Sequence, residues 1–184
     1  MCDPSGHREG EEPPPEDERF QEFDQIEQQK AINDKKAYFA NELISLLNDS
    51  TKVAQMTEVL LPQHHAIQLR QKRIEADDAI SVARRHLEQE TIEEVSFQDL
   101  EHINEIIYDL TQKILELAPH TTNLWTEPVK SIRTDVHEIL RSVDKALDDI
   151  EDFARAVLGP DLEKQHLYFN RYFAIYGELV SRAP

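Results

Sequence analysis

The sequence predicts an all-α protein: an elongated antiparallel helical bundle with coiled-coil-like heptad packing and about five helices. Two apolar series support this prediction, because apolar side chains recur in steps of three and four residues from Val129 to Val157 and again from Leu100 to Leu117. An α-helix has about 3.6 residues per turn, so such a repeat keeps one apolar face toward a neighbouring helix. The third observation is that the chain has only four glycines, whereas sheets use glycine in their tight turns.

The helix predicted from Val129 to Val157 is the one around which we expect the bundle to form. Its inward positions are Val129, Ile132, Val136, Ile139, Val143, Ala146, Ile150, Phe153 and Val157. Three further apolar residues, each following an inward position by one, widen this face: Leu140, Leu147 and Ala154. A face of this width is typical of a helix that touches two or more neighbours. The intervening residues are mostly acidic and are expected to be solvated.

The chain is expected to divide into a tail, residues 1–19, and one helical-bundle domain, residues 20–184. The tail combines prolines with acidic residues and shows no apolar periodicity. It therefore lacks the surface needed to offset the entropy of ordering, and we predict that it is disordered. The functional alternative is a short linear motif for a basic partner.

The first part of the domain is expected to contain two helices. Apolar residues at helical spacing begin at Phe20. Residues 48–50, Asn-Asp-Ser, are good capping residues, so they predict a break and a second helix from about Thr51. Pro62 has no amide hydrogen to donate and predicts a further interruption.

Residues 63–93 have sparse apolar positions and much of the positive charge of the chain, at Arg70, Lys72, Arg73, Arg84 and Arg85. Two interpretations are open. Either this basic helix packs beside the acidic outer face of the helix at 129–157, or it forms a stripe to which a partner docks. Under the second interpretation the candidate partner-binding residues are Arg70, Arg73, Arg84 and Arg85.

Other helix boundaries have clear local signals. Ser96 and Asp99 approximate a capping box that opens a helix, and Pro119 ends it. Gly159 and Pro160 end the long helix, because glycine adopts the left-handed cap conformation and proline cannot continue the helix.

A final helix is predicted from about Asp161. Its heptad register contains Leu162, His166, Phe169, Phe173, Tyr176 and Val180, with Tyr168 and Tyr172 beside it. Aromatic clusters fill protein cores and also dominate protein interfaces, and both interpretations are open here. If the surface is an interface, its partner-binding residues are Phe169, Tyr172, Phe173 and Tyr176.

Charge and composition exclude several classes of partner. The formal net charge of −17 argues against binding to nucleic acid, which depends on lysine and arginine, and disfavours anionic membrane surfaces. No apolar run is long enough for a membrane span, so no membrane insertion is expected. The one cysteine, Cys2, permits no intrachain disulfide. We therefore expect an intracellular protein, cytoplasmic or nuclear.

Residues with catalytic spacing are few. Glu163 and His166 form one Glu-x-x-His pair, whereas di-iron bundles need two, and His166 lies on the apolar stripe. His64 and His65 are adjacent and so about 100° apart on a helix, which predicts that their side chains diverge. The absence of a glycine-rich phosphate loop completes this picture. We expect no catalytic residues, no metal, no cofactor and no small-molecule substrate.

Three function classes remain. The first is a non-enzymatic structural or adaptor subunit, which assembles through heptad helices into a larger cytoskeletal, kinetochore or tethering complex. The second is a self-contained bundle that recognises one protein partner through its aromatic final helix or its basic middle helix. The third and most remote is a metal- or ligand-binding bundle enzyme with a pocket near His166. The expected partners are proteins with heptad helices or further copies of the chain.

Overall fold

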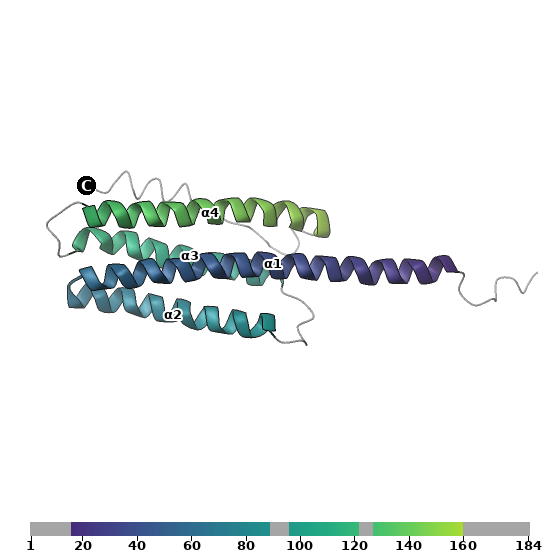
Figure 1. The fold of residues 1–184 in the computed structure, drawn as a ribbon, viewed down its shortest axis with the longest axis horizontal. Coiled ribbons are helices and arrows are strands. Elements are labelled where there is room, and N and C mark those ends of the chain that lie inside the picture. Colours follow the sequence, from purple (N-terminus) through teal and green to yellow (C-terminus); the bar gives the residue numbers. More distant parts are fainter. Residues whose placement is uncertain (1–15, 89–95, 122–126, 160–184) are drawn as a thin grey trace, which may run out of the picture. The chain divides into compact units, whose positions relative to one another are not determined.

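Helices make up the regular structure of the described part of the chain. The computed structural model describes residues 16–88, 96–121 and 127–159, and it contains four α-helices there (Figure 1). These are α1, Glu16–Leu60; α2, Gln63–Glu88; α3, Phe97–Leu117; and α4, Glu127–Leu158. A short 3₁₀ helix, η2, Ala118–His120, follows α3 directly. The all-α prediction is confirmed for these residues.

The chain divides into two compact units, Met1–Lys35 and Lys36–Pro184. Their boundary lies within the segment 20–184, for which the sequence predicts one domain. Helix α1 contributes residues to both units. In the first unit the apolar side chains of Phe23 and Ile26 are exposed, whereas the second unit contains the hydrophobic core.

The two apolar series form the centre of this core. The buried residues of α3 include Leu100, Ile103, Ile107, Leu110, Ile114 and Leu117. Those of α4 are Ile132, Val136, Ile139, Leu140, Val143, Ala146, Leu147, Ile150 and Ala154. Val129, Phe153 and Val157 are partly buried against the same core, and α3 contacts both α2 and α4. The inward faces predicted for both helices are therefore confirmed.

An aromatic cluster joins three helices at one end of the second unit. The Phe153 ring, late in α4, has its centroid 5.8 Å from that of Phe39 in α1 and 6.0 Å from that of Phe97 at the start of α3. The ammonium nitrogen of Lys36 lies 4.8 Å from the Phe97 centroid, a favourable cation–π distance. Because Phe153 lies in the last two turns of α4 while Phe97 is the first residue of α3, these two helices run antiparallel.

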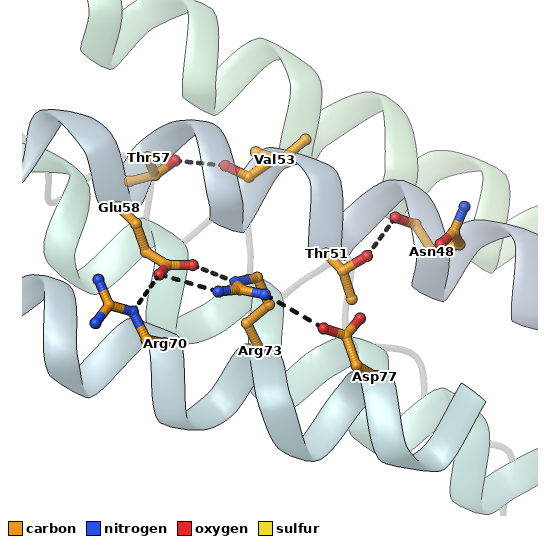
Figure 2. A network of polar contacts seen from close by, with 8 residues as sticks. All are labelled: Asn48, Thr51, Val53, Thr57, Glu58, Arg70, Arg73 and Asp77. Carbon is orange, nitrogen blue, oxygen red and sulfur yellow. Dashed lines mark hydrogen bonds and ion pairs between the residues drawn. The ribbon is translucent and has the colours of Figure 1, made fainter. Parts of the chain in front are cut away.

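The predicted break at residues 48–50 is wrong, because α1 continues without interruption to Leu60. The Ser50 hydroxyl donates to the Leu46 carbonyl oxygen at 2.9 Å. The Thr51 hydroxyl donates to the Asn48 carbonyl oxygen at 2.7 Å, as Figure 2 shows. These bonds satisfy the hydroxyls inside the helix, so the side chains do not cap a new one. Burial of Ser50 and Thr51 outweighs their local preference for a helix end.

The other helix boundaries agree with the sequence. Helix α1 ends before Pro62. The Pro62 carbonyl oxygen accepts hydrogen bonds from the backbone amides of His65 and Ala66 in the first turn of α2. Ser96 and Asp99 form a capping box at α3, with both hydrogen bonds present at 3.1 and 3.0 Å. Pro119 lies in η2 directly after α3, and Gly159 after α4 has a φ of 54°, as a left-handed cap requires.

Some predicted elements lie outside the described residues. These are most of the tail, residues 1–15, and the whole final helix predicted from Asp161, which would be the fifth helix. The prediction of a disordered tail over residues 1–19 is wrong for residues 16–19, because α1 begins at Glu16, four residues before the helical spacing detected at Phe20.

The buried apolar face of α4 leads to a stability prediction. Ile150 is fully buried, so replacing it by Asp places a carboxylate in the core and is expected to cost about 4 kcal/mol or more. This is a large part of the roughly 5–15 kcal/mol that stabilises an ordinary domain. Asp149 is exposed beside it, and Asp149→Asn is expected to change stability by about 0.5 kcal/mol or less. Urea denaturation followed by circular dichroism measures both, and equal stability of the two variants would contradict the assigned face.

Candidate interaction surface

Helix α2 is held to α1 by a carboxylate with two arginine partners. Glu58 lies in the last turn of α1, and the Nε of Arg70 donates to its Oε1 at 3.1 Å. The Nη2 of Arg73 donates to the same oxygen at 3.3 Å, and its Nε pairs with Oε2 (Figure 2). The Nη1 of Arg73 also donates to Asp77 at 3.3 Å. These contacts join the end of α1 to the early part of α2.

The two arginines differ in their environment. The side chain of Glu58 is 7% exposed, that of Arg73 is 21% exposed and that of Arg70 is 54% exposed. The hydrogen bond from Arg73 to Glu58 raises the pKa of the guanidinium above its ordinary value. A buried carboxylate needs a partner of this kind, because desolvation otherwise strongly disfavours its charge. The Glu58–Arg73 pair is therefore the central contact, and Arg70 adds to it from the surface.

This pairing corrects one interpretation of the basic helix. One of the two interpretations of the sequence has this basic helix packing beside the acidic outer face of the helix at 129–157, yet Arg70 and Arg73 both pair with Glu58 of α1. Glu58 itself is absent from the sequence-based candidates. Its position four residues before Pro62 gives no local signal of burial, and only the packing of α1 on α2 places it inside.

The outward side of α2 carries apolar side chains that remain exposed. Ile67, Ile74 and Val82 are each between 43% and 48% exposed. Ile67, Ile74 and Arg85 share one direction, because separations of seven, eleven and eighteen residues are close to whole numbers of helical turns. Val82 lies beside them, about 60° away. We call these four residues the α2 stripe.

A groove of about 330 Å³ opens next to the C-terminal part of this stripe. Its walls come from α1, α2 and α3, and they are mostly apolar: Ala40, Ile44, Ala79, Val82, Ala83, Leu87, Ile103 and Ile106. Val82 belongs to both the stripe and the groove. A hollow of this size beside an exposed apolar row is suited to an anchoring side chain of a partner.

The polar residues at the groove do not form a catalytic arrangement. They are His86, Asp99 and His102, and all three are exposed. The Asp99 carboxylate accepts the Ser96 backbone amide in the α3 capping box. Within the described ranges no group of three His, Cys, Asp or Glu side chains could hold a metal ion.

The predicted partner-binding residues fall into three groups. Arg70 and Arg73 contact α1, while Arg84 and Arg85 are exposed near the end of α2, with only Arg85 on the stripe. The aromatic candidates Phe169, Tyr172, Phe173 and Tyr176 lie outside the described residues. The groove residues were missed, because Val82 and Ala83 fall outside the sparse apolar register of this helix.

The helices that the structure describes include none that is long and apolar enough to cross a membrane.

The unequal burial of the two arginines predicts unequal costs of removing them. Arg73→Ala leaves the buried Glu58 with only the surface arginine, and we expect a loss of roughly 2–4 kcal/mol. Arg70→Ala removes a half-exposed partner and is expected to cost about 1 kcal/mol or less. Urea denaturation of the full chain measures both variants. If removing Arg70 cost as much as removing Arg73, the Glu58–Arg73 pair would not be the central contact.

Comparison of the chain with protein-family models, with curated proteins and with solved structures finds no significant match.

Proposed function

We propose that the protein is a non-enzymatic binding subunit of a larger protein assembly. It acts as a bundle that is complete in its own core and holds an amphipathic helix of a partner protein along the α2 stripe. The observation that carries this proposal is a contrast within the second unit. The heptad faces of α3 and α4 are buried by the chain's own helices, while the stripe of α2 is exposed.

This contrast favours the self-contained bundle over assembly through shared heptad helices. A partner helix could take the place of one of the chain's own helices on the apolar face of α4 only if buried residues such as Val136 and Ile150 first lost their present contacts. Each large apolar side chain exposed in this way costs roughly 1.5–3 kcal/mol. Docking on the α2 stripe requires no such opening. The bundle therefore serves as a rigid support for the helix that carries the binding surface.

The stripe specifies the chemistry of its partner. From Ile67 to Arg85 it extends for about 27 Å, the length of five helical turns. A partner helix with apolar residues at three- and four-residue spacing matches Ile67, Ile74 and Val82, and one large side chain enters the groove. An acidic residue on that helix would face Arg85. At physiological salt the Debye length is about 8 Å, so this local pair acts despite the net negative charge of the whole chain.

The surroundings of the groove support a binding role without catalysis. A catalytic site needs polar groups held out of water and aimed at one point, with protonation suited to the reaction. The polar residues at this groove are exposed and separated along α2 and α3, and Asp99 already caps α3. The remaining walls supply contact area for an apolar side chain.

The proposal predicts that Ile74→Glu combined with Val82→Glu abolishes partner binding while the bundle stays folded. Both side chains are half-exposed, so the substitutions leave the core intact. Affinity purification with the full chain, followed by titration of the copurified partner, is expected to show roughly thirtyfold weaker binding or more, equivalent to about 2 kcal/mol. Arg85→Glu is expected to weaken the same complex by a smaller factor.

The matched control is Lys145→Glu, a charge reversal at an exposed position of α4 away from the stripe. It is expected to bind as the natural chain does. Phe173→Ala tests the alternative binding surface, because Phe173 belongs to the aromatic surface predicted in the final segment. If Phe173→Ala weakened binding and the two stripe substitutions did not, the proposal for α2 would be wrong.

A further inference from the structure

Three histidine rings meet where the start of α2 approaches the end of α3. His65 in the first turn of α2 has its ring centroid 4.0 Å from that of His64 and 4.3 Å from that of His120. The planes of the His65 and His120 rings differ by only 20°, so these rings stack. His120 ends η2, which contacts α3 and α4. The prediction that the His64 and His65 side chains diverge is wrong, since their ring centroids lie 4.0 Å apart with the planes tilted by 42°.

The stack is suited to neutral rings. The Nδ1 of His65 is buried and has no hydrogen-bond partner. In a neutral ring whose proton is on Nε2 this nitrogen is an unpaired acceptor, but in a protonated ring it becomes a charged donor with no acceptor, which is far more costly. A second positive ring 4.3 Å away would add direct repulsion. Protonation therefore opposes the stacked arrangement in two independent ways.

The charged surroundings act in the same direction. Three ionisable groups of the described chain disfavour a positive charge on His65: His64 on α2, His120 on η2 and Lys113 on α3. Lys113 is paired at 3.4 Å with Glu116, the nearby acidic side chain on that helix. After Thr121 the next ionisable residue in sequence is Glu127. Burial and these like charges lower the pKa of His65 from its ordinary value of 6.5.

We propose that His64, His65 and His120 form a proton-sensitive joint, which holds the start of α2 against the corner of α3 and η2 when the His65 ring is neutral and releases it when that ring is protonated. The sign follows from linkage. A histidine that is harder to protonate in the closed joint favours the closed form above its ordinary pKa, and this preference is lost as pH falls from about 6.5 toward the lower pKa of the closed form. The response therefore falls in the mildly acidic range, below the ordinary histidine pKa of 6.5.

The expected effect is opposite to that of the rest of the molecule. A chain with a net charge of −17 repels itself less as protons bind, so general acidification between about pH 7.5 and 5.5 favours the compact state. A local loss of structure in the same interval therefore identifies the joint.

Hydrogen exchange of the full chain tests the proposal. After correction for the intrinsic pH dependence of exchange, the hydrogen-bonded amides of residues 65–68 and those of Ala118 and Thr121 are expected to lose protection by roughly threefold or more between about pH 7.5 and 5.5. Amides in the middle of α4 are expected to keep theirs. His65→Phe retains a stacking ring without a titrating proton and is expected to remove the acid effect. The control His102→Gln, at an exposed histidine of α3 away from the corner, is expected to retain it.

Two results would overturn the proposal. One is an acid loss of protection that persists unchanged in His65→Phe. The other is an NMR titration of the natural chain in which the His65 ring takes up its proton at or above pH 6.5. This measurement does not depend on the folding of any variant. A His65 titration below that value, together with loss of protection confined to the two segments, supports the joint.

Discussion

The burial of one wide apolar face on α4 is the interaction on which the second unit depends. This face packs with the apolar face of α3, and Phe153 extends it to Phe39 of α1 and Phe97 of α3. Burial of apolar area is the largest favourable contribution to folding, and it is not directional. The orientation of the two helices comes from the similar spacing of apolar residues in α3 and α4. This spacing places both apolar faces inward along the length of the helices.

Polar contacts then determine how α2 sits against this core. Glu58 is a costly residue to bury, and Arg73 with its fork of donors satisfies the carboxylate from the facing helix. Such a pair contributes less to stability than apolar packing does. In this arrangement Ile67 and Ile74 face outward. The buried residues of α2 are Ala66, Leu69, Ala76 and Ile80, and the α2 stripe is exposed because it lies on the other side of the helix from them.

The two functional proposals concern different parts of α2. The stripe extends along the outward side of the helix, and the histidine joint lies at its first turn. Ile67 follows His65 by only two residues, so release of the joint would reach the beginning of the binding surface. Val82 and the groove lie about five turns away, beside α3, where the core holds the helix more firmly. Acid sensitivity is therefore expected to be greatest at one end of α2.

The sequence by itself determined the helical class, the inward faces of α3 and α4, and the boundaries at Pro62, Ser96, Pro119 and Gly159. These features follow from local rules, because periodicity sets the buried face of a helix while proline, glycine and capping side chains act within a turn or two. The same local rules failed at residues 48–50. There the hydroxyls bond back to the helix, and burial against distant residues outweighs the tendency of these side chains to cap.

Only the tertiary structure decided which charged and polar residues meet. Glu58 and Arg73 are fifteen residues apart in sequence, and His65 and His120 lie on separate elements, so no spacing rule relates the members of either group. The groove beside Val82 likewise needs walls from three helices. Such contacts depend on how helices align after their apolar faces have been buried, and the alignment is a property of the whole core rather than of any one segment.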